Sequence, residues 1–222
     1  MTEETTSRTR VRVWDVPTRL LHWLLVVSFA VSWWTGETGR LEWHRWSGYL
    51  VLGLIVFRVY WGFVGSSTAR FAEFLRGPRT IASYLRGTWP PVPGHNPLGA
   101  LSVIGLLGLS GVQVALGLFA VDVDGIESGP LSMYVSFETG RAAAEWHEAV
   151  FNVLLWLVGL HIIAIAWYRW VRGERLLGAM VHGNRDFPGD PPSLGAVSVV
   201  RLVFGVLLAA AFTWLVIRAF QF

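Results

Sequence analysis

The sequence predicts an all-α integral membrane protein: a bundle of four transmembrane helices with a fifth, C-terminal transmembrane helix. Hydrophobic residues make up 53% of the 222 positions and charged residues only 15%, well below the roughly one quarter that is usual in soluble domains. The chain also has 13 Trp, a residue that collects where a membrane meets water. Five stretches are apolar over a length near the roughly 20 residues that a bilayer crossing needs.

These five stretches are predicted to cover residues 18–35, 46–64, 97–121, 147–170 and 199–217. Asp15 and Pro17 precede the first stretch and are typical of the start of a helix. Its far end, at residues 32–36, lacks the small residues of a signal-peptide cleavage site, so we expect a retained helix. In the third stretch, Gly105, Gly108, Gly111 and Gly117 would let a neighbouring helix approach closely.

The distribution of charge favours contact with membrane lipid over nucleic acid. The net charge is +3 and the isoelectric point about 9.8, and every basic residue apart from His is Arg. These arginines lie between the apolar spans rather than along one basic face, so they indicate topology and lipid-headgroup anchoring. The chain has no Cys, which excludes disulfides, thiolate-bound iron–sulfur clusters and covalent attachment of haem through C-x-x-C-H.

Loop charge also predicts the orientation of the bundle. Arginines are concentrated before the first span, between the second and third, and after the fourth: Arg8, Arg10, Arg12 and Arg19; Arg70, Arg76, Arg79 and Arg86; Arg169, Arg172, Arg175 and Arg185. The other connections carry fewer Arg and more acidic residues. The positive-inside rule then places the N-terminus in the cytoplasm and, with five spans, the C-terminus on the opposite side.

Four of the six histidines lie in or at the edge of a span: His22, His44, His147 and His161. Ionisable residues at membrane depth are usually functional. A lone His in a span, however, is as readily a neutral imidazole that hydrogen-bonds to a neighbouring helix as a functional residue. His147 and His161, however, are 14 residues apart, nearly four helical turns or about 21 Å along the axis. In a hydrocarbon core about 30 Å thick, one of them lies in each leaflet.

The predicted topology gives each of these two histidines a partner at its own depth. His147 is outer and His161 inner, while His44 opens the second span on the outer side and His22 opens the first on the inner side. The resulting pairs, His44 with His147 and His22 with His161, are two bis-imidazole sites that suit haem iron. Zinc usually has three or four protein ligands, and a proton relay does not require matched pairs at two depths.

Two further sets of residues have alternative interpretations. Arg58 lies 14 residues after His44, on the same helix face at the depth of the inner site, so it either binds a haem propionate or snorkels to the interface. Near the inner end of the first span, one group forms either a quinone head-group site or a helix cap with an interfacial belt: Arg12, Trp14, Asp15 and Arg19.

The remaining polar candidates lie in the loops. Arg40 and Arg45 flank the outer ligand His44, where they would anchor the surface or meet propionates or an electron partner. His95 and His182 fall in predicted cytoplasmic loops. We expect both to be surface or interface residues rather than ligands.

The sequence resembles bacterial cytochrome b561 together with the cytochrome b subunits of nickel–iron hydrogenases. The resemblance covers roughly residues 10–185 and rests on several short motifs as well as the four histidines: Val11-Arg12-Val13-Trp14-Asp15, Pro17-Thr18-Arg19, His22-Trp23, Gly48, Arg58, Trp61-Gly62 and Arg70-Phe71. It implies a four-helix core with two haem b, in which all four histidines are ligands.

The resemblance also implies a bacterial inner-membrane location, a periplasmic C-terminus and electron exchange between quinone and a redox partner protein. That partner would be a periplasmic cytochrome or a dehydrogenase or hydrogenase subunit. The short interval between His22 and His44 is closer to the small stand-alone cytochromes, which suggests a superoxide:quinone oxidoreductase as an alternative. A proton or ion transporter with intramembrane His is a third hypothesis, from another functional class.

The predicted organisation has two parts. Residues 1–185 form the dihaem cytochrome b transmembrane domain, and residues 186–222 form a linker and the additional transmembrane helix. That last helix contains no His, so we expect it to serve packing or the docking of a partner.

Overall fold

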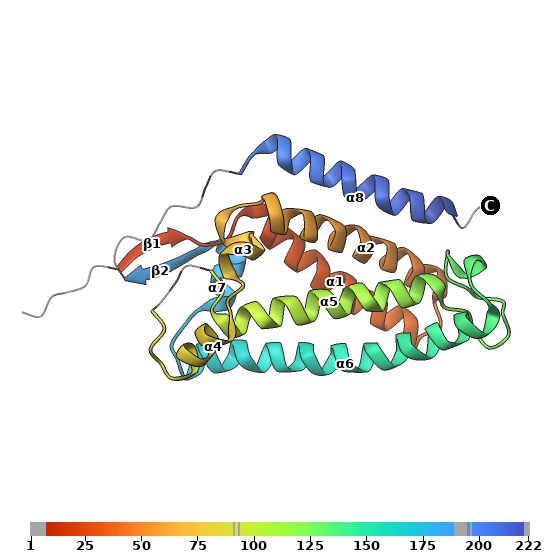
Figure 1. The fold of residues 1–222 in the computed structure, drawn as a ribbon, viewed down its shortest axis with the longest axis horizontal. Helices are drawn as coiled ribbons and strands as arrows, with labels where there is room; N and C mark the ends of the chain where they lie inside the picture. The colour runs from red at the N-terminus through yellow and green to blue at the C-terminus, as the bar shows by residue number, and fades with distance from the viewer. Residues whose placement is uncertain (1–7, 91, 93, 189–194, 196, 220–222) are drawn as a thin grey trace, which may run out of the picture.

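The computed structural model describes residues 8–219 apart from 91, 93, 189–194 and 196. Five of its helices are long and apolar enough to cross a membrane: α1 (Val16–Glu37), α2 (Leu41–Val64), α5 (Pro97–Phe119), α6 (Phe137–Trp170) and α8 (Val199–Ala219). They confirm the predicted all-α membrane fold (Figure 1).

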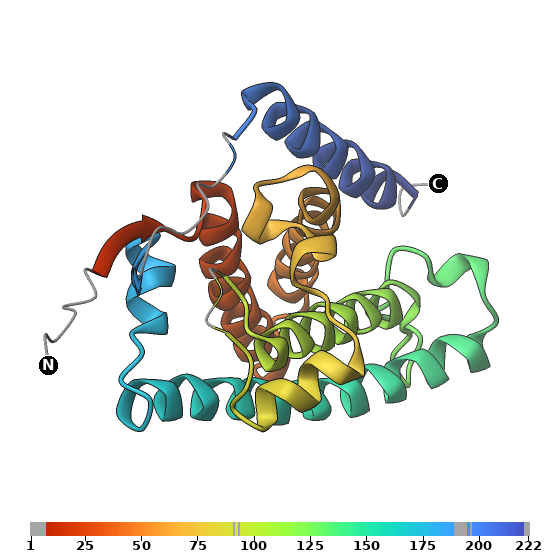
Figure 2. The ribbon, with the colours of Figure 1, turned by 60° about the vertical axis from the view of Figure 1, so that its left-hand side comes forward.

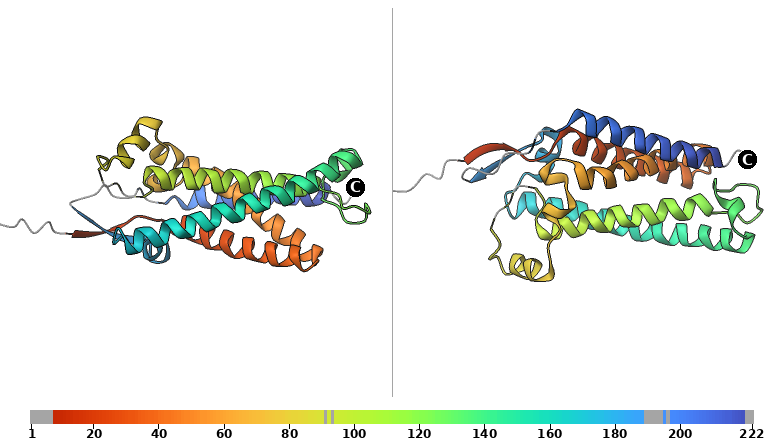
Figure 3. Two further views of the ribbon diagram at one scale, coloured as in Figure 1. Left: turned by 90° about the horizontal axis from the view of Figure 1, so that it is seen from below. Right: turned by 45° about the horizontal axis from the view of Figure 1, so that its top comes forward.

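The helices form two hairpins with α8 added at one side. Helix α1 packs on α2 and α5 packs on α6, while α2 also contacts α5 and joins the hairpins into a four-helix bundle. Helix α8 packs on α2, on the outside of the bundle, as Figures 2 and 3 show. Many large apolar side chains point outward from these helices, for example Trp156 at 82% exposure, as expected of surfaces that face lipid.

Three of the span helices, α1, α5 and α6, begin at side-chain caps. Asp15 accepts a hydrogen bond from the Thr18 amide at the start of α1 (2.7 Å), and Ser136 accepts one from the Thr139 amide at the start of α6 (3.2 Å). Helix α6 therefore begins ten residues before the predicted boundary at His147. Its first turns carry charged residues, so an apolar stretch of sequence identifies only the part of this helix that enters the membrane.

A small two-stranded sheet joins the segment before α1 to the segment after α7 (Leu176–His182). The sequence did not predict this sheet. Strand β1 (Arg8–Arg12) pairs antiparallel with β2 (Asn184–Pro188), with Val11 opposite Arg185. The domain division at residue 185 falls within β2 and stays a prediction. Most of the predicted linker, residues 189–194 and 196, lies outside the described residues, as do residues 1–7 and 220–222.

Short helices fill the end of the bundle that carries this sheet. They are the 3-10 turn η1 (Ser67–Ala69), α3 (Phe71–Phe74), α4 (Pro78–Leu85) and α7 (Leu176–His182). The opposite end carries the connection between α5 and α6, with the 3-10 turn η2 (Ser132–Tyr134). The three Arg-rich connections therefore lie at one end of the bundle (Figure 1).

Candidate functional site

The structure brings the four span histidines together as two pairs. The ring centroids of His44, on α2, and His147, on α6, are 5.9 Å apart. Those of His22, on α1, and His161, on α6, are 6.5 Å apart. Two imidazoles that share one metal ion need a metal–nitrogen bond of about 2 Å on each side and about 1 Å more to each ring centre, roughly 6 Å in all. Both pairs therefore have the spacing of axial ligands.

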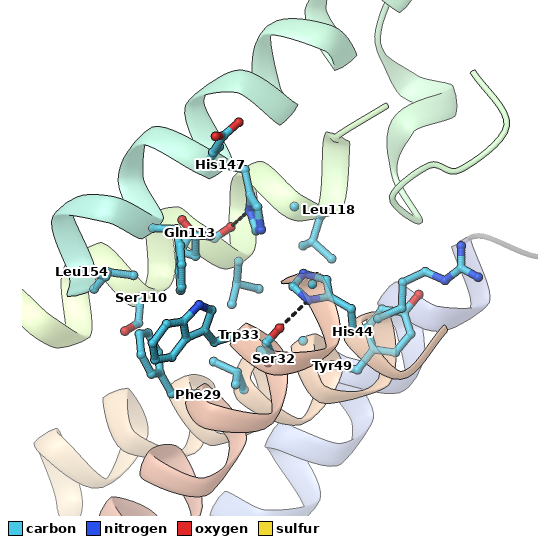
Figure 4. Close-up of a pocket in the computed structure, with 18 of the residues that line it drawn as sticks. Phe29, Ser32, Trp33, His44, Tyr49, Ser110, Gln113, Leu118, His147 and Leu154 are labelled. Atoms are coloured by element: carbon cyan, nitrogen blue, oxygen red, sulfur yellow. Dashed lines mark hydrogen bonds between the residues drawn. The ribbon is translucent and has the colours of Figure 1, made fainter. Parts of the chain in front are cut away.

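Hydrogen bonds at Nδ1 fix the orientation of the outer rings. His44 Nδ1 lies 2.9 Å from the Ser32 carbonyl oxygen, and His147 Nδ1 lies 2.8 Å from that of Gln113. A carbonyl only accepts, so each Nδ1 carries the proton and donates, which leaves the Nε2 lone pair free to bind a metal. Figure 4 shows the two rings pointing into one cavity, each held by its bond.

The inner pair has one comparable contact. His161 Nδ1 lies 3.1 Å from the Ser102 hydroxyl. No third His, Cys, Asp or Glu joins either pair to make a possible metal-binding group within the described part of the chain. Each site thus offers two imidazoles, fewer than zinc usually takes.

A cavity of about 310 Å³ surrounds the outer pair, and side chains of α1, α2, α5 and α6 line it. The lining is mostly apolar, as expected for a site that takes a large, flat, apolar group. Glycines make room for the two ligand rings. A Cβ on Gly117 would lie 2.9 Å from His147 Cε1, and one on Gly36 would lie 3.2 Å from His44 Nδ1.

Arg58 is buried, with only 6% of its surface exposed, so it does not snorkel to the interface. Its Nη1 donates to the Ala69 carbonyl (3.3 Å) and its guanidinium lies 4.9 Å from the centre of the Phe71 ring. No carboxylate lies within 4.0 Å of it among the described residues. The buried Asp15 carboxylate acts on Arg58 only from a greater distance. A buried cation with no carboxylate in contact is costly, so this position suits an anionic group.

Most of the other predicted candidates have structural contacts. Asp15 is buried, caps α1 and accepts a hydrogen bond from Trp61 Nε1 (3.0 Å), so it follows the helix-cap interpretation. Arg19 Nη1 donates to the Val181 carbonyl (2.5 Å). The other arginines take these positions: Arg12 is exposed on β1, Arg40 stacks on Trp34 at 4.7 Å, and Arg45 pairs with Glu127 at 2.6 Å.

His95 is half-buried between aromatic rings rather than exposed at the surface, whereas His182 is exposed as expected. The His95 ring lies between Trp14 and Phe74, at centroid distances of 4.5 and 4.7 Å. Burial, with smaller contributions from the nearby Arg58, His161 and His22, lowers the pKa of His95 to about 3, so the imidazole is neutral. His95 lies outside every apolar span. The only signal in the sequence was its position just before Asn96 and Pro97, where a helix starts.

Comparisons with known proteins agree with this architecture. The family model of prokaryotic cytochrome b561 matches residues 13–183. A probable Ni/Fe-hydrogenase B-type cytochrome subunit of Azotobacter chroococcum is 25% identical, with 86% of this chain and 94% of the relative covered. A probable Ni/Fe-hydrogenase 1 B-type cytochrome subunit of Escherichia coli is 26% identical, with 78% and 79% covered. No solved structure matches. The chain therefore belongs to the prokaryotic cytochrome b561 family, and it is a membrane-spanning b-type cytochrome that transfers electrons.

Proposed function

We propose that the protein binds two haem b, one between His44 and His147 and one between His22 and His161, and passes electrons between quinone and a redox partner protein. The observation that carries the proposal is the presence of two imidazole pairs with ring centroids 5.9 and 6.5 Å apart. A haem iron between two imidazoles supplies reversible one-electron transfer. The chain itself supplies the ligands, their orientation and an apolar enclosure.

Hydrogen bonds pre-organise the ligands. The carbonyls of Ser32 and Gln113 hold the outer rings with Nε2 free, and a donated Nδ1 proton raises the basicity of the ligating nitrogen. The Ser102 hydroxyl contacts His161 in the inner site. Rings that are already held lose little freedom on binding. The iron would therefore keep the same two ligands in both oxidation states.

Arg58 supports the proposal at the inner site. It is buried at 6% exposure, has no carboxylate within 4.0 Å among the described residues, and contributes to the lowered pKa of His95 together with His22 and His161. A propionate of the inner haem would supply a contacting negative charge through a charge-assisted hydrogen bond, in addition to the more distant Asp15. The inner site would thus join an apolar ring system to a buried cation at its edge.

The orientation of the bundle follows from its charges. The connections rich in Arg all lie at the end that carries α3, α4, α7 and the β1–β2 sheet (Figure 1). The positive-inside rule favours this end as cytoplasmic, which puts the His44–His147 site near the periplasm and the C-terminus on the periplasmic side. A periplasmic redox protein would then exchange electrons with the outer haem.

The names of the relatives favour a hydrogenase as that partner, because both are hydrogenase B-type cytochrome subunits. The short interval between His22 and His44 instead favours a stand-alone superoxide:quinone oxidoreductase. The proteins that co-purify with the chain in a mild detergent separate these two functions. A defined hydrogenase complex supports the first, and superoxide-dependent reduction of a quinone analogue by the isolated chain supports the second.

Four single variants test the ligand assignment: His22→Ala, His44→Ala, His147→Ala and His161→Ala. We expect the His44 and His147 variants to lose one haem and the His22 and His161 variants to lose the other, so that reduced-minus-oxidised spectra fall into two classes. Loss of the same haem from the His22 and His44 variants would contradict the pairing. The absence of a haem signal from the wild type and from all four variants would contradict haem binding and favour the transporter hypothesis.

A further inference from the structure

His95 carries a polar atom for which the described structure provides no partner. Its Nδ1 is buried from solvent and makes no hydrogen bond among the described residues. The ring is clamped by aromatic contacts with Trp14 and Phe74, so it cannot turn freely to find a partner elsewhere. A buried nitrogen without a hydrogen bond destabilises the folded protein, so its position calls for an explanation.

The backbone that carries His95 is also fixed. The neighbouring Asn96 caps α5 by accepting a hydrogen bond from the Gly99 amide (2.7 Å). Its Nδ2 donates to the hydroxyl groups of Tyr84 (3.0 Å) and Tyr168 (2.9 Å), which also bond to each other. This network ties the start of α5 to α4 and to the inner end of α6. Both the side chain and the main chain of His95 are therefore held in place.

Its surroundings relate His95 to the inner histidine pair. Phe74, which packs on His95, also packs on Phe71, and the Phe71 ring centre lies 4.9 Å from the Arg58 guanidinium. Helix α5 begins two residues after His95, and its Ser102 hydroxyl contacts His161 at 3.1 Å. Arg58 is itself buried and has no carboxylate within 4.0 Å among the described residues. A buried cation and an imidazole with an unused nitrogen thus lie close together at the end of the bundle that carries the inner pair, and both can donate a hydrogen bond.

We propose that His95 is a second hydrogen-bond donor to the inner-haem propionates, alongside Arg58, and thereby a positioning residue that sets the potential of that haem. The inference rests on the haem sites of the proposed function. A propionate carboxylate has two oxygens and several acceptor sites, enough for a guanidinium and an imidazole together. A donated hydrogen bond draws negative charge away from the iron, which disfavours the ferric form and raises the midpoint potential.

Two substitutions separate this role from packing. His95→Phe keeps an aromatic ring between Trp14 and Phe74 but has no donor. His95→Gln keeps an N–H donor but loses the ring. His182→Phe is the matched control, since it changes an exposed His on the same cytoplasmic end.

The experiment is a redox titration of the full-length chain with both haems resolved, after the haem-to-protein ratio has been measured. We expect His95→Phe to lower the inner-haem midpoint potential, His95→Gln to restore part of it, and both to leave the outer haem unchanged. The control should match wild type. As a second readout, haem labelled with ¹³C at the propionate carboxyls should show a shifted carboxylate band in the redox-difference infrared spectrum of His95→Phe.

An inner-haem potential and a labelled band that both match wild type in His95→Phe would overturn the inference, even if quinone reduction were slower. If His95→Phe does not accumulate in the membrane, the same comparison is made with His95→Leu, which also lacks a donor, where a change in the labelled band supports the inference and an unchanged band contradicts it. A wild-type protein with no inner haem would instead refute the proposed function, so the two failures are distinguishable.

Discussion

Replacing Gly117 by Ala tests whether His147 is held in place as a metal ligand. The new Cβ would lie 2.9 Å from His147 Cε1 and 3.1 Å from its Nδ1, while ordinary contact begins near 3.4 Å. The ring must therefore move by about 0.5 Å, against the 2.8 Å hydrogen bond that holds Nδ1 on the Gln113 carbonyl. Overpacking of this kind costs about 1–3 kcal/mol.

This cost acts on haem binding rather than on the helix. Ala is a better helix former than Gly by about 1 kcal/mol, so α5 itself gains slightly from the change. Without haem the His147 side chain can rotate away from the new methyl group, whereas a ligating ring cannot. The strain thus appears in the bound state, and since 1.4 kcal/mol is tenfold in affinity, we expect binding of the outer haem to weaken by about tenfold to hundredfold.

Gly108→Ala is the matched control, because Gly108 is exposed on the same helix and a Cβ there meets nothing within 4 Å. Transfer of haem from the purified protein to excess apomyoglobin measures retention at both sites. We expect Gly117→Ala to release one haem faster than wild type while the other stays, and Gly108→Ala to behave like wild type. Equal retention in the two variants would show that His147 is not constrained as described.

Three further predictions concern charged residues. Arg58→Leu removes a cation near the inner haem, which should lower the midpoint potential of that haem by tens of millivolts. A charge at about 8 Å with an effective dielectric constant of about 20 is worth roughly 2 kcal/mol before screening. A redox titration in which the inner haem is unshifted would refute this prediction. Asp15→Ala removes a cap worth about 1 kcal/mol and leaves the Trp61 N–H unsatisfied at about 1–3 kcal/mol, so the thermal midpoint in detergent should fall clearly, and an unchanged midpoint would contradict it. Glu127→Gln breaks a half-exposed ion pair with Arg45 worth about 1 kcal/mol or less, so the same assay should register little change, and a large drop would disprove a surface role.

Local sequence predicted the spans and the helix class because apolar runs of membrane length have few alternative structures. The proximity of His22 to His161 and of His44 to His147 could also be anticipated, because helical pitch converts a 14-residue spacing into two depths and loop charge orders the helices. Helix boundaries were less predictable where polar turns extend a helix beyond the membrane, as at the start of α6.

Contacts between distant segments could not be read from the sequence. His95 is half-buried because Trp14 and Phe74, from other parts of the chain, pack against its ring, and nothing in its own loop signals those contacts. Strands β1 and β2 are five residues each: β1 alternates Arg with Thr or Val too briefly to show a pattern, and β2 does not alternate at all. Arg58 is intermediate: its depth was predictable, whereas its enclosure by Ala69 and Phe71 depended on how the chain turns after α2.

The central claim is that one chain holds two haem b between two histidine pairs. The most direct test is the pyridine haemochrome content of the purified protein relative to its protein concentration, combined with the low-temperature electron paramagnetic resonance spectrum of the oxidised form. The account predicts two haem b per chain, both low-spin, as bis-imidazole ligation requires. A ratio of one or zero, or a high-spin signal from a full second site, would contradict it.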